Sequence, residues 1–272
     1  IEGSVQDLFV VRSKQAVTVQ GQVGASTLEA NGDIVVEGGI AGKDKAKLRT
    51  GGKLSAKFCD AATVRASDDV VILKEVINSK IHTDGRLRIM RGALIGGCVH
   101  ARNGIEVRTL GSSAGVKTTV SVGMDPRLCQ QIAKLDLQIS KRREAAERVR
   151  ALVKPLLPEL KGLAGWQRQR ASQLLGEVRQ LDRAVRELQE QRQQLVDWGR
   201  ATREPAVTVT SQIHPGVTVI VDGLASTFDQ PRKGHVKLVK RCIDNQMELV
   251  AVDQLSGSVT VLPSYRYRAE RS

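Results

Sequence analysis

Residues 81–89 read IHTDGRLRI, and this stretch predicts the fold because four similar stretches occur elsewhere in the chain. Each shows an apolar, a polar and a small residue, then a three-residue turn, then two apolar residues flanking one variable residue. The five units are LEANGDIVV (28–36), LRTGGKLSA (48–56), VRASDDVVI (64–72), IHTDGRLRI (81–89) and VHARNGIEV (99–107). Such alternation around Gly, Asn and Asp turns is typical of short β-strands.

The spacing of the units predicts a β-helix. Their small residues recur every 16 to 20 residues, which is too short for a strand and a helix. One unit cannot bury its apolar face, whereas stacked coils can, and each coil adds ~4.8 Å. The composition agrees, since 41% of residues are hydrophobic but only 3% are aromatic. Handedness stays open, because apolar residues six apart also suit a left-handed β-helix of the acyltransferase type, although the uneven coils count against it.

At Gly123 the pattern changes to that of helices. Asp125 can accept hydrogen bonds from free N–H groups at a helix start, and Pro126 suits the first helical position. Apolar residues then follow heptad spacing in two runs, within 128–153 and 174–195. The segment between the runs contains helix-breaking residues, namely Pro155, Pro158, Gly162 and Gly165.

The two runs therefore predict an antiparallel helical hairpin with arms of about 35 residues, each ~50 Å long. An arginine interrupts each apolar seam, Arg142 in the first run and Arg192 in the second. These arginines either specify the register of the helices or extend their charged ends into solvent, and the second interpretation is favoured.

The chain thus reads as a mainly β protein with an α insertion, a parallel β-helix (solenoid) interrupted by a coiled-coil hairpin. We expect the β-helix over residues 1–124, the hairpin over 125–203, and further strands over 204–272 that stack on or cap the β-helix. The basic tail contains YRYR (265–268), which we expect to be loose.

Several stretches resemble the flagellar assembly protein A family. They are GGIAG (38–42), AKFCDAATV (56–64), LGSSAGVKTTVSVG (110–123) leading into Asp125-Pro126, and IHPGV (213–217), where Tyr is more usual at His214. The resemblance spans nearly the whole chain, from about residue 17 to 255. It implies a right-handed β-helix, a cytoplasmic location, and a role in flagellar assembly or cell-pole organisation through protein contacts. It implies no catalytic residues, and it does not extend to the N-terminal domain that members usually carry.

Charge and cysteine usage narrow the classes of function. The chain has 42 Lys and Arg against 29 Asp and Glu, a net charge of +13, which suits nucleic acid, anionic lipid or acidic protein as partners. Residues 125–203 alone hold 17 basic and 10 acidic residues. No apolar run is long enough to predict a membrane span. The four cysteines form no CxxC pair, which argues against a zinc knuckle or redox motif and fits a reducing cytoplasm.

Motifs that suggest catalysis have simpler structural explanations. Only three residues separate Gly38 from Gly42, and Asp44 stands where a P-loop needs Ser or Thr. Asp68 and Asp69 occupy a repeat turn, where Asp is favoured for hydrogen bonding to the backbone. No nucleophile elbow, HExxH motif or Ser/His/Asp order is present. We therefore predict no catalytic residue, cofactor or metal.

His82 and His100 occupy equivalent positions in neighbouring coils, which would bring them within ~5 Å. Such a pair could bind a metal ion or sense pH. However, Arg49 and Arg65 occupy the same position in earlier coils. A solvated outer ladder of polar side chains is therefore the favoured interpretation.

Basic and aromatic residues define a candidate partner surface. Lys43, Lys45 and Lys47 could contact phosphate, but no aromatic residues lie nearby for stacking on single-stranded nucleic acid, and a solubilising face is favoured. Trp166 and Trp198 stand near opposite ends of the second helix, in structural or partner-binding roles. The candidate residues are Lys43, Lys45, Lys47, Arg142, Arg143, Trp166, Arg192 and Trp198.

The function that these features favour is a non-enzymatic scaffold or adaptor, whose protein partners belong to flagellar or polar machinery. Self-association through hairpin seams or β-helix ends is also open. The first alternative is a basic protein that binds the phosphate backbone of nucleic acid non-specifically. The second is the left-handed acyltransferase, which needs an active-site His at a coil junction and usually forms trimers.

Overall fold

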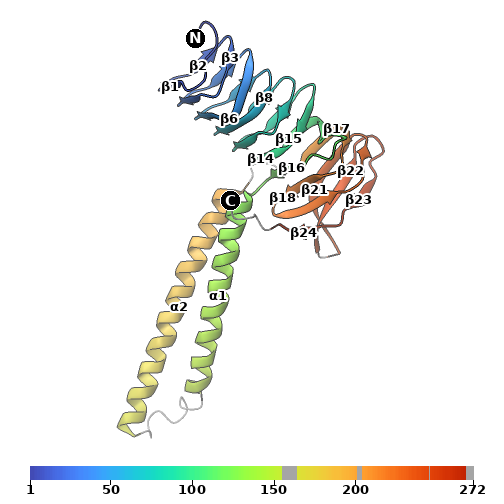
Figure 1. Ribbon diagram of the computed structural model, residues 1–272. Coiled ribbons are helices and arrows are strands. Elements are labelled where there is room, and N and C mark those ends of the chain that lie inside the picture. Colours follow the sequence, from blue (N-terminus) through green and yellow to red (C-terminus); the bar gives the residue numbers. More distant parts are fainter. Residues whose placement is uncertain (155–163, 201–203, 245, 268–272) are drawn as a thin grey trace. The chain divides into compact units, whose positions relative to one another are not determined.

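The computed structural model describes residues 1–154, 164–200, 204–244 and 246–267 (Figure 1). These residues form two compact units. One comprises Ile1–Pro126 and Arg200–Ser272, and the other comprises Arg127–Gly199. The first unit carries the strands, and the second carries the helical hairpin.

Short parallel strands of the first unit stack on three faces, so that successive coils of the chain contribute to each face. The first face contains β1 (Val10–Ser13), β4 (Thr27–Ala30), the ends of β6 (Gly39–Thr50) and β8 (Cys59–Ala66), β11 (Lys80–Thr83), β14 (Gly97–Ala101), β16 (Thr118–Val122) and β18 (Val217–Val221). The second contains β2 (Val17–Val19), β5 (Ile34–Val36), β7 (Leu54–Ala56), β9 (Val70–Ile72), β12 (Leu87–Ile89) and the starts of β15 (Ile105–Leu110) and β17 (Val207–Ile213). The third contains β3 (Gln22–Val23), the starts of β6 and β8, β10 (Val76–Ile77), β13 (Ala93–Ile95) and the ends of β15 and β17. The predicted parallel β-solenoid is confirmed.

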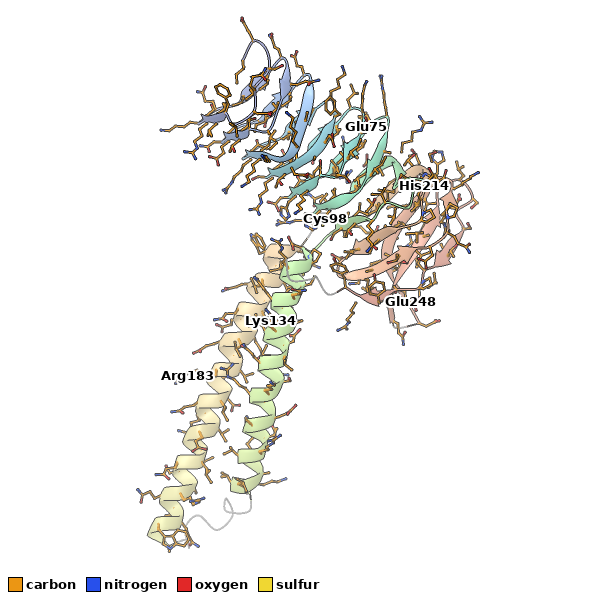
Figure 2. The ribbon with its side chains drawn as sticks, in the orientation of Figure 1. Glu75, Cys98, Lys134, Arg183, His214 and Glu248 are labelled. Atoms are coloured by element: carbon orange, nitrogen blue, oxygen red, sulfur yellow. The ribbon has the colours of Figure 1, made fainter. Side chains whose placement is uncertain are left out.

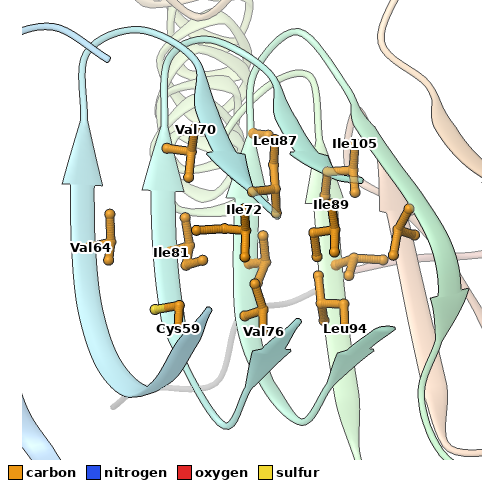
Figure 3. Packing of buried hydrophobic residues seen from close by; sticks show 14 of the residues in the cluster. Cys59, Val64, Val70, Ile72, Val76, Ile81, Leu87, Ile89, Leu94 and Ile105 are labelled. Carbon is orange, nitrogen blue, oxygen red and sulfur yellow. The ribbon is translucent and has the colours of Figure 1, made fainter. Parts of the chain in front are cut away.

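The apolar positions of the repeat form continuous columns inside the solenoid. On the second face, the successive register partners are Val17, Ile34, Leu54, Val70, Leu87, Ile105 and Val207, and all are buried. Figure 3 shows part of this core, with Val70, Leu87 and Ile105 in line. Burial of each aliphatic side chain contributes ~1.5–3 kcal/mol, so the columns supply the main stabilisation.

The turns between the columns are held by polar side chains that bond within the turn and to the neighbouring coil. The Thr83 hydroxyl donates to the carbonyl oxygen of Asp68 and accepts the N–H of Gly85 at 3.1 Å. Asp68 accepts the N–H of Asp69 at 2.7 Å, and Asp69 accepts the N–H of Arg86 at 2.8 Å. The structural interpretation of the Asp68–Asp69 pair as turn residues is confirmed.

The hairpin interrupts one coil without breaking the stack. Ile105 and Val207 are direct register partners, although both helices lie between them in the chain. The chain turns away from the coils at Gly123, whose φ is +82°. A Cβ atom there would lie 2.1 Å from Asp222 Oδ1 and 3.0 Å from Pro205 Cγ, so no side chain fits. The closeness of Gly123 and Pro205 shows that the chain leaves and rejoins the solenoid at neighbouring points.

Helices α1 (Pro126–Val153) and α2 (Gly165–Gly199) run antiparallel (Figure 1). The predicted helix start at Pro126 is confirmed. The buried residues of the seam are Leu128, Ile132, Ile139, Ala146 and Val153 on α1, and Ala171, Val178, Val185 and Gly199 on α2. The predicted turn residues Pro155, Pro158 and Gly162 lie outside the described residues.

After the hairpin, the strands first extend the solenoid and then reverse direction. β17 and β18 continue the parallel faces. The antiparallel strands that follow are β19 (Leu224–Phe228), β20 (Arg232–Lys233), β21 (Val236–Ile243), β22 (Gln246–Asp253), β23 (Val259–Val261) and β24 (Tyr265–Arg266). β20 and β21 pair with β17, and β19 pairs with β18, so these last parallel strands have partners on that side.

The expectation of a loose tail is wrong for its described part. Tyr265 pairs with Ala225 in β19, and its hydroxyl oxygen lies 3.1 Å from that of Thr227. The N–H of Tyr267 donates to the Gly223 carbonyl oxygen at 2.9 Å. These pairings tie the tail to a hairpin that is distant in sequence, and Arg268 lies outside the described residues.

Candidate functional site

The three lysines of the candidate surface lie on β6 and are exposed. Lys43 and Asp44 have φ values of +48° and +60°, so the strand bends at this point. Lys43 Nζ lies 2.7 Å from Asp7 Oδ2, and this bond holds the pKa of Asp7 below its ordinary value. One of the three positive charges is therefore matched locally, while Lys45 and Lys47 extend the basic character of the strand.

The arginines of the candidate surface lie on both helices. Arg143 on α1 is exposed, and Arg142 is half-buried. Arg192 Nε donates to Asp136 Oδ1 across the hairpin at 2.6 Å. A second pair across the hairpin joins Arg150 to Asp182. Where Arg192 interrupts the apolar seam, it therefore forms an ion pair between the helices. This favours a role of Arg192 in specifying the register of the two helices over simple extension of its charged end into solvent.

The two tryptophans lie at opposite ends of α2. Trp166 is 68% exposed and Trp198 is 63% exposed. Their separation along the helix is ~48 Å at ~1.5 Å per residue. They therefore do not form one surface.

The histidines lie on the outer side of the first face of the solenoid. Arg49, Arg65, His82, His100 and Ser121 are successive register partners on neighbouring strands. Both arginines are exposed, and the His82 side chain is 41% exposed, but His100 is only 7% exposed. The prediction of a solvated ladder holds for the arginines and is wrong for His100. Along this face the outward side chains become less exposed from Arg49 to Ser121. The buried ones lie in the last coils before the chain continues into the helices.

The two imidazole rings are stacked, with centroids 4.8 Å apart and an interplanar angle of 28°. His100 Nδ1 lies 3.3 Å from Ser121 Oγ, and His82 Nδ1 lies 3.5 Å from Asp125 Oδ2. Burial lowers the pKa of His100 to about 4, and the neighbouring His82 adds to this effect. Burial also lowers the pKa of His82, against the opposing effects of Asp125 and Asp84. Both rings are therefore largely neutral at neutral pH.

Asp125 is the residue whose place in this cluster the sequence did not reveal. Its predicted role was to start α1, which begins directly after it. Only the folding of residues 123–125 beside the first face brings its carboxylate to His82. The repeat pattern ends before this segment, so the repeat could not align Asp125 with the histidines.

A comparison with protein families identifies the solenoid. Residues 1–246 match the Flagellar Assembly Protein A beta solenoid domain. The chain belongs to this family. The match spans the coils before the hairpin and the strands after it, in agreement with the register of Ile105 and Val207. Searches of the curated proteins and of the solved structures returned no match.

In the part of the chain that the structure describes, neither helix is apolar enough over a sufficient length to cross a membrane. Both helices instead carry charged side chains along their length, such as Lys134 and Arg183 in Figure 2.

Proposed function

We propose that this protein is a non-enzymatic scaffold or adaptor in flagellar assembly or cell-pole organisation, acting in the cytoplasm through contacts with other proteins. The observation that carries this proposal is the family match over residues 1–246, which includes a separately compact helical unit inserted into a coil. Flagellar assembly enters the proposal from the family description.

In this proposal the coils of residues 1–124 and the strands of 204–272 form a rigid platform, and the hairpin within 125–203 is the recognition arm. Helical surfaces bind partners through exposed apolar residues placed among charged ones. The hairpin offers such residues, since Leu137 is 57% exposed and Leu152 is 63% exposed, besides the two exposed tryptophans. Its excess of basic residues favours an acidic protein partner.

The proposal is tested by complementation in the bacterium from which the gene comes. Three forms are compared in a deletion strain: the full chain, a chain in which a short Gly/Ser linker replaces residues 127–199, and the charge-reversal variant Arg142→Glu with Arg143→Glu. We expect the full chain to restore flagella and the other two forms to fail. A matched control with Arg179→Glu and Arg183→Glu changes the charge equally on α2 and should restore them.

A parallel experiment identifies the class of partner. Nuclease-treated lysate is passed over the full chain and over the hairpin deletion. Specific proteins retained by the full chain alone support the adaptor, and sedimentation of the pure protein detects self-association through the hairpin. Loss of all bound material after nuclease treatment, with no effect of the deletion, would overturn the proposal in favour of phosphate binding by Lys43, Lys45 and Lys47. Retention of an acyl-CoA by trimers would favour the acyltransferase.

A further inference from the structure

Three side chains with metal-binding atoms converge on the outer side of the first face. His82 comes from β11, His100 from β14, and Asp125 from the segment that precedes α1. Their ligand atoms all lie within 4.8 Å of one another. The two histidines are brought together by strand register and Asp125 by the turn after β16, so the cluster is held by the backbone of the solenoid.

The distances suit a tetrahedral ion. Zinc binds nitrogen and oxygen ligands at ~2.0–2.2 Å, which places neighbouring ligand atoms ~3.3 Å apart. His82 Nδ1 and Asp125 Oδ2 are already 3.5 Å apart. The widest pair of ligand atoms, at 4.8 Å, needs a closure of ~1.5 Å. Changes in side-chain torsion angles of the half-exposed His82 and of Asp125 are the movements that such a closure requires.

The surroundings of His100 are those of a metal ligand. A ligating histidine usually places its second ring nitrogen in a hydrogen bond, which fixes the ring orientation. His100 Nδ1 has such a partner in the buried Ser121 hydroxyl, and this leaves Nε2 for an ion. Metal ions bind the neutral form of imidazole through the ring nitrogen that carries no proton.

The charges around the cluster narrow the choice of ion. Asp84 lies near His82 but pairs with Arg102 at 2.7 Å, while Arg65 faces His82 from the preceding coil. These two arginines oppose any cation, and only one carboxylate belongs to the ligand set. Ca²⁺ and Mg²⁺ require several oxygen ligands and do not fit this set. Two imidazoles with one carboxylate suit zinc and similar transition metals.

We propose that His82, His100 and Asp125 bind one divalent transition-metal ion, with Zn²⁺ as the expected species and water in the remaining position. The bound ion joins two neighbouring coils to the last residues before α1. It thereby fixes the chain at the point where it leaves the solenoid.

The test uses the full chain, stripped with a chelator and titrated with Zn²⁺ in competition with a colorimetric zinc indicator at neutral pH. We expect a single site with a dissociation constant that rises about tenfold or more in His82→Gln and in Asp125→Asn. His82 is half-exposed, so His82→Gln should remain folded, which circular dichroism checks. Co²⁺ is a second probe, and its visible spectrum should show tetrahedral nitrogen and oxygen ligation without a thiolate band.

Two matched variants separate this site from adventitious binding. His235→Gln removes an exposed histidine outside the cluster, and Cys98→Ser removes an exposed thiol on β14. Both should bind Zn²⁺ as the original chain does. The proposal is overturned if the chain binds no Zn²⁺, if binding survives in both His82→Gln and Asp125→Asn, or if Cys98→Ser alone abolishes it.

Discussion

Replacement of Leu87 by alanine tests whether the inward columns are a close-packed core. Leu87 is fully buried, as are its register partners Val70 and Ile105 on either side. A Leu→Ala change in a core costs the transfer free energy of the lost carbons and a further amount for the cavity, together ~2–5 kcal/mol. The cost falls when the surroundings can collapse into the cavity.

The backbone around Leu87 resists such collapse. Its own N–H donates to the Gly104 carbonyl oxygen at 3.1 Å, and the N–H of Val70 donates to the Arg86 carbonyl oxygen at 2.8 Å. These bonds set the spacing between coils on both sides of the cavity. We therefore expect a loss at the upper end of the range, ~3–5 kcal/mol in the free energy of unfolding.

The assay is urea unfolding followed by far-ultraviolet circular dichroism. The matched control is Met90→Ala, because Met90 follows the same strand but is 60% exposed, and its expected change is within ~0.5 kcal/mol. Both tryptophans lie in α2, so their fluorescence follows the hairpin separately and should be unchanged. A loss for Leu87→Ala no larger than for Met90→Ala would refute the packed-column description.

The turn at Ser79 supports three further predictions. Ser79→Ala should lower the free energy of unfolding by ~1–3 kcal/mol, as measured in urea. The buried hydroxyl donates to the Ile77 carbonyl oxygen at 2.7 Å and accepts the N–H of Ala62 at 3.2 Å, and both bonds are lost. An unchanged unfolding midpoint would contradict this. Gly97→Ala should lower the free energy of unfolding by ~1–3 kcal/mol, because φ is +75° and a Cβ would lie 2.2 Å from the Ser79 carbonyl oxygen. An unchanged free energy of unfolding would show that the turn relaxes to accept the side chain. Burial raises the pKa of Cys59 from its ordinary 9.0 to about 11, so the folded state holds the thiol proton more tightly. The free energy of unfolding should then fall by ~2 kcal/mol as pH rises from about 9 to about 11, relative to Cys59→Val, and parallel pH curves for the two proteins would contradict it.

The inward columns could be read from the sequence because strand alternation is a local property. Once the units at 64–72 and 81–89 are aligned, the register of Val70 with Leu87 follows, and the structure confirms it. Burial of an outward residue is not local. Nothing in the repeat distinguishes His100 from Arg65, yet one is buried and the other exposed.

The difference arises where the repeat ends, since residues beyond β16 belong to no unit and their path depends on the turn at Gly123. The tail shows the same limit of local patterns. Its strand, Tyr265–Arg266, forms only because β19 offers an antiparallel edge. Neither the edge nor the pairing has a counterpart in the earlier coils.

The way in which the hairpin is inserted explains how one chain can carry both the faces of a solenoid and the surface of a helical hairpin. In a stacked repeat, each coil depends on its nearest neighbours alone. The register of Ile105 with Val207 preserves that contact, and the closeness of Gly123 and Pro205 means that the excursion demands no gap in the stack. Changes in the helices therefore leave the platform intact, and changes in outward coil residues leave the helical seam intact. The residues from Gly123 to Asp125 are the exception, because they belong to the solenoid and determine where the chain departs from it. A site that holds Asp125 against His82 and His100 acts on a segment through which the chain passes from the solenoid to the helices.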